Sequence, residues 1–148
     1  MAAKVISVSR VIPVPAQKIF DLLADPAMHP VLDGSGTVKG SRSSNPERLS
    51  LGSRFGMDMR IGGPYRVTNR VTEFEEGKRI AWCHLARYTW RYELESQNGA
   101  TKVTESFDTT TGFAPAFAIR ILGFFRRNEE SMRKTLENIE RYFTETPA

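Results

Sequence analysis

The spacing of the apolar residues changes near residue 115 of this chain, and that change limits the fold more than any other feature. Between residues 55 and 109, apolar and polar residues alternate. This period of two is typical of strands that bury one face. It predicts strands near residues 55–61, 65–72, 79–84, 87–94 and 102–109, with turns at Gly62-Gly63-Pro64, Glu76-Gly77 and Asn98-Gly99.

Beyond residue 115 the apolar residues follow the period of a helix. They recur three, four or seven positions apart and therefore share one face of a helix. The stripe consists of Phe117, Ile121, Phe125, Met132, Leu136, Ile139 and Phe143. This pattern predicts one long helix over about residues 115–144.

Shorter elements precede the alternating region. Residues 4–11 alternate loosely and predict a first strand, in which Val5, Ile6, Val8 and Val11 are apolar. The apolar positions of residues 16–24 predict a short helix that ends before Asp25-Pro26. Residues 26–36 predict a loop with one helical turn, and residues 37–42 predict a further strand.

This order of elements predicts an α+β fold, in which an antiparallel sheet of six to seven strands packs against the long helix. The 148 residues match one domain of ordinary size, so we expect a single domain over residues 1–148. Antiparallel sheets commonly bury one face and leave the other in water. The strand arginines share one parity and are expected outside, whereas the large aromatic residues and methionines share the other parity and are expected inside.

Charge and cysteine content narrow the range of partners. The net charge of +4 is carried by arginines scattered from Arg10 to Arg141, so we expect no nucleic-acid partner. A single cysteine, Cys83, excludes an internal disulfide and a multi-cysteine metal site. The two histidines lack the spacing of metal ligands, and no dinucleotide or phosphate-loop motif occurs. We therefore expect no metal and no cofactor.

The apolar segments are short. No run of 18 apolar residues occurs, and the N-terminus lacks the apolar stretch of a signal peptide. We therefore expect a cytoplasmic location, no transmembrane segment and no more than transient contact with a membrane.

Four segments carry a resemblance to a known family: VSRVIPVPAQKIFDLLADPAMHPVLDGS, IAWCH, TWRYELESQNGATKVTESFD and the terminal helix. With the order of elements, they resemble the START-like (SRPBCC, helix-grip) superfamily, and within it the bacterial proteins of the polyketide cyclase/dehydrase and lipid-transport group. The resemblance covers about Val5–Phe143. It implies a curved sheet gripping the long helix, two short helices after the first strand, and a ligand cavity between sheet and helix.

Four polar residues, Asn69, His84, Glu105 and Thr109, have the parity assigned to the interior. A buried carboxylate without a partner is costly, so Glu105 is expected either to pair or to become neutral. In a cavity it would serve as a general acid or a hydrogen-bond donor, and His84 could share its proton. The alternatives are an ion pair of Glu105 with Arg120, and a surface or turn position for His84.

Residues 111–125 are the most apolar stretch of the chain, and Arg120 is the one charged residue within it. The stretch is interpreted as a helix start wedged between the sheet and its loops, as a hydrophobic lip through which a lipid-like ligand enters, or as a self-association surface. We expect a monomer or a weak homodimer.

Three functions are consistent with these features. The first is binding or carrying a hydrophobic small molecule, such as a lipid, an isoprenoid or a polyketide-like compound. The second is a cyclase/aromatase or dehydratase-like enzyme with Glu105 and His84 as catalytic residues. The third is a non-catalytic interaction module. The residues predicted to contact a ligand are Phe55, Met57, Met59, Tyr65, Asn69, Trp82, Tyr88, Trp90, Tyr92, Phe107, Thr109, Phe117, Ile121 and Phe125.

Overall fold

Seven strands form one antiparallel sheet in the computed structural model, which describes residues 5–34, 38–41, 45–60, 63–83, 88–110 and 118–145. Strands β2 to β7 form a meander, and β1 pairs with β7 at one edge, in the order β1-β7-β6-β5-β4-β3-β2. The strands are β1 (Val5–Ile12), β2 (Val38–Ser41), β3 (Arg54–Arg60), β4 (Pro64–Glu75), β5 (Arg79–Cys83), β6 (Thr89–Gln97) and β7 (Ala100–Asp108).

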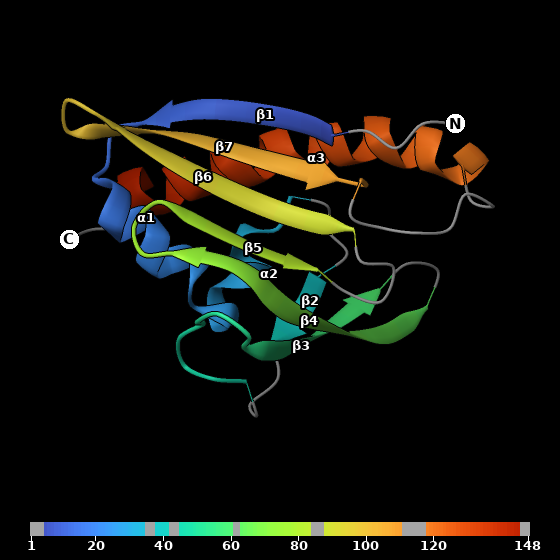
Figure 1. Cartoon of the computed structure of the whole chain (residues 1–148). Helices are drawn as coiled ribbons and strands as arrows, with labels where there is room; N and C mark the ends of the chain where they lie inside the picture. The colour runs from blue at the N-terminus through green and yellow to red at the C-terminus, as the bar shows by residue number, and fades with distance from the viewer. Residues whose placement is uncertain are drawn as a thin grey trace.

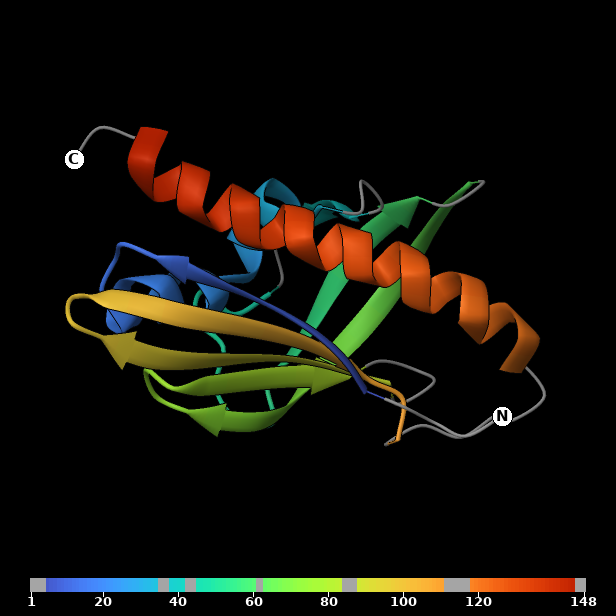
Figure 2. The same cartoon turned by 90° about the horizontal axis from the view of Figure 1, so that it is seen from above.

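Four helical segments accompany the sheet: α1 (Ala16–Leu23), the 3-10 helix η1 (Pro26–Met28), α2 (His29–Leu32) and α3 (Ala118–Glu145). Figure 1 shows β1, β7, β6, β5 and β4 following one another from top to bottom, with α3 behind the upper strands. In Figure 2 the sheet curves around α3, so that β1, β6 and β7 lie on one side of the helix and the ends of β3 and β4 emerge on the other. The α+β helix-grip fold is therefore confirmed. We call the concave face, toward α3, the inner face.

The predicted stripe of the long helix packs into the core. Met132, Leu136 and Ile139 are at most 1% exposed, and burying each such side chain stabilises the fold by roughly 1.5–3 kcal/mol. Arg10 of β1 reaches Glu140 of α3 with Nη2 3.0 Å from Oε2. The helix is therefore attached to the edge strand both by apolar packing and by an ion pair.

The hairpin between β6 and β7 has the turn that its sequence predicts. Asn98 and Gly99 have φ angles of 50° and 85°, and they connect the paired residues Gln97 and Ala100. A two-residue turn with positive φ at both positions matches the right-handed twist of the flanking strands, and Asn-Gly tolerates it best. This turn sets the register of β6 against β7, which positions the candidate site.

Strand β1 buries a different set of residues from the one its apolar pattern indicates. Val5 and Val11 are 46% and 53% exposed, whereas Val8 and Ile12 are buried. The inner face of β1 follows the even-numbered positions, so the two odd-numbered valines lie on the outer face. The predicted strand is confirmed, but two of the five apolar residues of β1 belong to the solvent side.

Several predicted positions lie outside the described residues. They are His84, Arg87 and Phe117, together with the side chains of Tyr65, Arg66, Arg120, Ile121 and Phe125. Arg60, Arg70 and Arg79 are described and exposed, as the parity of their strands predicts. No helix among the described residues is long and apolar enough to cross a membrane.

Candidate ligand-binding site on the inner face of the sheet

Strand pairing arranges the inner-face residues in rows. Phe107, Trp90 and Trp82 are opposite one another on β7, β6 and β5. The next row contains Glu105 and Tyr92. Because paired residues project from the same face of a sheet, the register alone brings an aromatic row beside a row that contains a carboxyl group.

Six rings form what we call the aromatic wall: Phe55, Trp82, Tyr88, Trp90, Tyr92 and Phe107. Their centroids are 4.5 Å apart for Trp90 and Phe107, and 5.8 Å apart for Tyr88 and Phe107. Trp82 is 5.6 Å from both Phe55 and Tyr92. These spacings are those of ring pairs in direct contact. The rings thus form two contacting groups, one around Trp82 and one around Phe107, and the pairing of Trp82 with Trp90 places the two groups side by side.

His29, at the start of α2, packs onto this wall. Its ring stacks on Trp82 with the centroids 4.7 Å apart and lies edge-on to Phe55 at 5.3 Å. Its Nε2 lies 2.8 Å from the carbonyl oxygen of Leu23, so Nε2 carries the proton and donates it. Desolvation lowers the pKa of His29, which keeps the ring neutral. From the sequence, His29 falls within the predicted loop over residues 26–36, because no local pattern indicates its contact with Trp82.

Burial of the inner face decreases toward one end of the sheet. On β6, Leu94 and Tyr92 are buried but Trp90 is half-buried, and on β3 Phe55 is buried but Met59 is half-buried. We call this end of the sheet the open end. The partly exposed apolar residues near it are Ile6, Val38, Met59, Val67, Tyr88 and Trp90. The same end of several neighbouring strands thus leaves large apolar side chains incompletely covered.

Glu105 lies one row deeper than this partly exposed region. It is 3% exposed, and its cross-strand neighbours are Val8 on β1 and Tyr92 on β6. The Tyr92 hydroxyl donates a hydrogen bond to the carboxyl group. The other oxygen, Oε1, is buried without a hydrogen-bond partner among the described residues. The predicted register of the strand over residues 102–109 is therefore confirmed.

Burial determines the protonation of this pair. Desolvation raises the pKa of Glu105 well above its usual value, and the negative charge of Asp33 adds to this effect against the opposing hydrogen bond from Tyr92. Desolvation is also the largest cause that raises the pKa of Tyr92, and the nearby carboxyl of Glu105 raises it further. Both groups therefore favour their protonated, neutral forms, in which each can act as a hydrogen-bond donor.

The other predicted contact residues fall into two groups. Met57 and Asn69 are buried on the inner face, near the wall residues that share their strands or pairing rows, and Thr109 is buried just beyond the end of β7. Met59, Tyr88 and Trp90 are half-buried at the open end. Their roles in ligand contact, and the catalytic roles of Glu105 and His84, stay predictions.

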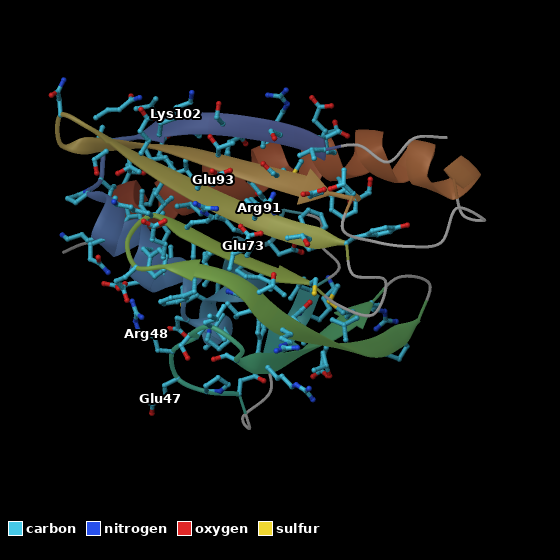
Figure 3. All side chains as sticks on the ribbon, in the orientation of Figure 1. Glu47, Arg48, Glu73, Arg91, Glu93 and Lys102 are labelled. Atoms are coloured by element: carbon cyan, nitrogen blue, oxygen red, sulfur yellow. The ribbon has the colours of Figure 1, made fainter. Side chains whose placement is uncertain are left out.

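The outer face has a different chemistry. A depression of about 300 Å³ on it is lined by charged and polar side chains with one leucine: Glu75, Lys78, Arg79, Glu93, Leu94, Glu95, Lys102 and Thr104. Figure 3 shows Glu73 of β4, Arg91 and Glu93 of β6, and Lys102 of β7 on this face. The depression is therefore polar, unlike the aromatic wall. Within the described residues, no group of three His, Cys, Asp or Glu side chains could hold a metal ion.

Comparison with known proteins places this geometry in a family. The family model described as polyketide cyclase / dehydrase and lipid transport matches residues 4–144. The uncharacterized protein Rv0088 of Mycobacterium tuberculosis is 37% identical over 130 residues, which cover 84% of this chain and 58% of the relative. The chain thus spans little more than half the length of that curated relative.

Solved structures share the fold at low sequence identity. The crystal structure of protein NE0264 from Nitrosomonas europaea has a TM-score of 0.75 at 16% identity, covering 95% of this chain and 94% of that one. The solution structure of the AHSA1-like protein from Aeromonas hydrophila has a TM-score of 0.61 at 20% identity, covering 93% and 91%. Both structures therefore share the fold of this chain over more than 90% of their length.

Proposed function

This chain belongs to the polyketide cyclase/dehydrase and lipid-transport family, and from that premise we propose that it binds and carries a hydrophobic small molecule of the lipid, isoprenoid or polyketide-like class. The ligand would lie between the inner face of the sheet and α3. A protein of this kind needs an apolar surface that is exposed to water when no ligand is bound. It also needs a few polar groups that orient the ligand.

The observation that carries the proposal is the decrease of burial along the inner face. Trp90, Met59 and Val67 are large or branched apolar residues at interior parity, yet they remain half-buried. Leaving such surface in water costs about 25 cal/mol per Å² of apolar area. An apolar ligand that covers this end of the aromatic wall would recover that free energy.

An enzyme is the second candidate, and one observation favours it. Glu105 is a buried carboxyl with a raised pKa beside a tyrosine hydroxyl, which is a pairing suited to proton transfer. A cyclase or dehydratase-like reaction also needs a second proton-transfer group, and His84, the residue predicted for it, lies outside the described residues. Binding requires fewer groups than catalysis and is therefore the preferred function.

The positions of the tryptophans allow a direct test of binding. The chain has two, Trp82 and Trp90, and both belong to the aromatic wall. A neutral naphthylamine probe, N-phenylnaphthylamine, accepts energy from tryptophan. If it binds on the inner face, we expect saturable energy transfer from the protein, and we expect fatty-acid methyl esters, isoprenoid alcohols or polyphenols to displace the probe.

Matched substitutions locate the probe. Val67→Thr changes a half-buried residue at the open end of the inner face, and Val11→Thr makes the same change on the exposed outer side of β1. We expect Val67→Thr to weaken probe binding about fivefold, since it puts a hydroxyl where the ligand would lie, and Val11→Thr to leave binding unchanged. Absence of saturable transfer, or equal effects of the two substitutions, would contradict the proposal.

A further inference from the structure

We propose that Glu105 and Tyr92 form a polar anchor that selects apolar ligands carrying a neutral hydrogen-bond-accepting oxygen, such as a ketone or an ether. This inference rests on the proposed function, because it specifies which hydrophobic molecules the inner face would take. It predicts that recognition of the ligand depends on one hydrogen-bond donor, the Glu105 carboxyl group, at the more buried end of the aromatic wall.

The position of the pair suits an anchor. Trp90 and Phe107 form one row of the inner face, and Tyr92 and Glu105 form the next row away from the open end. A flat or chain-like apolar molecule lying on the aromatic wall would therefore bring its inner end to the carboxyl group. Tyr92 belongs both to the wall, through Trp82, and to the anchor, through Glu105.

The protons of Tyr92 and Glu105 determine which hydrogen-bonding group the anchor presents to a ligand. A tyrosine hydroxyl has one proton, and Tyr92 gives it to Glu105. A neutral carboxyl group has one proton of its own, which belongs on the oxygen that does not accept from Tyr92. That oxygen is Oε1, which is buried and has no partner among the described residues. The free group is thus an O–H donor, and its complement is an acceptor on the ligand.

The charges around the pair disfavour ionic ligands. Among the described residues, Tyr92 on β6 and Asp33 at the end of α2 are the groups that act on the Glu105 carboxyl, and neither is a cation. An anionic ligand would meet the charge of Asp33 and would lack a counter-charge. An ammonium ligand would require Glu105 to ionise in a desolvated position, which costs more than donating to a neutral oxygen.

A matched ligand series tests the anchor. Methyl naphthyl ketone, isopropylnaphthalene and naphthylethylamine share one skeleton and differ in a single group, which is a carbonyl oxygen, a methyl or an ammonium. Affinities are measured by quenching of the two tryptophans in the wild-type chain. We expect the ketone to bind about tenfold more tightly than the hydrocarbon, as one buried hydrogen bond permits, and the amine to bind most weakly.

Substitutions at Glu105 assign the preference to the carboxyl group. Glu105→Leu removes the donor, so the ketone and the hydrocarbon should bind within about twofold of each other. Glu105→Gln retains a donor in nearly the same shape, so we expect most of the ketone preference to remain. This conservative variant keeps the test decisive if Glu105→Leu folds poorly.

Tyr92 acts as a positioning residue in this scheme. Tyr92→Phe keeps the ring of the aromatic wall but releases the Glu105 carboxyl, so we expect a several-fold loss of ketone preference with unchanged hydrocarbon affinity. Infrared spectroscopy supplies a second readout. The carbonyl band of the bound ketone should shift to lower frequency in the wild type and less in Tyr92→Phe.

The possible outcomes separate the two proposals. If none of the three ligands binds, the proposed function fails. If the hydrocarbon binds as tightly as the ketone, the inner face binds apolar molecules but the anchor is wrong. If the amine binds most tightly, or the infrared band of a protonated carboxylic acid is missing at neutral pH, Glu105 is ionised, and a cationic partner such as Arg120 replaces the anchor.

Discussion

At the scale of single residues, the buried position of Glu105 determines its protonation state. An ordinary glutamate is ionised at neutral pH, because its pKa lies near 4.3 in water. Glu105 is 3% exposed, and desolvation favours its neutral form. The side chain therefore destabilises the folded state increasingly as the pH rises. It lies on the inner face despite this loss of stability.

The pH dependence of stability follows with a definite sign. Because the pKa of Glu105 is raised in the folded state, the unfolded chain loses this proton first as the pH rises. Stability is then greatest below the unfolded pKa and falls by up to about 1.4 kcal/mol per pH unit until the folded pKa is reached. Glu105→Gln removes this loss, so its stability relative to the wild type should increase with pH.

Urea unfolding at constant ionic strength, from about pH 4 to about pH 8, measures this difference. Glu93→Gln is the matched control, since Glu93 is an exposed glutamate on the outer face of β6. Its stability relative to the wild type should vary by less than about 0.5 kcal/mol over the same range. A relative stability of Glu105→Gln that stays flat or falls with pH would show that the carboxyl is ionised and paired.

Sequence reasoning at this scale succeeded for Glu105 and failed for His29. The parity of Val103 and Phe107 predicts that Glu105 faces inward, and the structure confirms its burial. The contact between His29 and Trp82 joins positions far apart in the chain. It depends on how α2 docks on the sheet, and no local pattern carries that information.

At the scale of elements, a β-bulge in β4 organises the outer face. Val71 pairs with Trp82, but Ala81, the preceding residue of β5, pairs with Glu73, so β4 has one extra residue there. The extra residue reverses the parity of β4 beyond Thr72. Without it, Glu73 would project to the inner face with Val71. The predicted strand over residues 65–72 stops where this irregularity begins.

The bulge places Glu73 beside Arg91. The carboxylate lies 2.6 Å from Arg91 Nη2, and Arg91 also contacts Asp108 at 3.3 Å. Ala81, which is 0% exposed, occupies the β5 position between Glu73 and Arg91. Its small side chain leaves room for the two charged groups to meet across the intervening strand.

Removal of Glu73 should be costlier than removal of an ordinary surface glutamate. Glu73→Ala leaves Arg91, whose side chain is 17% exposed, with a weaker set of partners, and we expect a loss of about 1 kcal/mol, discounted for solvent screening. The hydrogen bond from Arg91 lowers the pKa of Glu73, so the stabilisation is present above the unfolded pKa and is lost as the pH falls through the folded one.

Glu93→Ala serves as the control for this prediction, because Glu93 is exposed on the same face and Figure 3 shows it near Arg91. Denaturant unfolding at low and high salt measures both variants, and the penalty of Glu73→Ala should decrease as salt screens the pair. Equal penalties for the two substitutions would mean that the bulge positions Glu73 without an energetic consequence.

At the scale of the whole molecule, a close approach between α2 and α3 closes one side of the structure. The backbone N–H of Gly34 donates to Thr135 Oγ1 at 2.9 Å, and Asn138 Nδ2 donates to the carbonyl oxygen of Leu32 at 3.0 Å. These bonds join segments about a hundred positions apart in the chain. They hold the end of α2, with Asp33, above the inner face.

Gly34 is required by this contact. A Cβ atom at residue 34 would overlap the carbonyl oxygen of Ser131 and would lie 2.7 Å from the backbone nitrogen of Thr135. Both obstacles are backbone atoms of a helix, which cannot move aside cheaply. Gly34→Ala should therefore destabilise the fold by about 1–3 kcal/mol, as measured by thermal or denaturant unfolding.

Gly63→Ala is the matched control, since a Cβ there would meet nothing within 4 Å. We expect a change within about 0.5 kcal/mol for this variant. If Gly34→Ala is as harmless as the control, then α2 and α3 can separate without cost and the closure is not part of the stable fold.

The sequence by itself determined the kind and order of the elements and which face of most strands is buried. Periods of two and of 3.6 are local properties of a chain, because they follow from the geometry of one strand or one helix. The meander of strands, the long helix and the inward position of Glu105 could therefore be predicted.

Only the tertiary structure decided what these residues meet. The hydrogen bond of Tyr92 with Glu105 depends on strand register, the meeting of Glu73 with Arg91 depends on a bulge, and the contact of His29 with Trp82 depends on helix docking. Each joins residues separated along the chain, and its free energy exists only after the strands and helices have assembled. The candidate site is made of such contacts, so its chemistry emerges from the assembled fold.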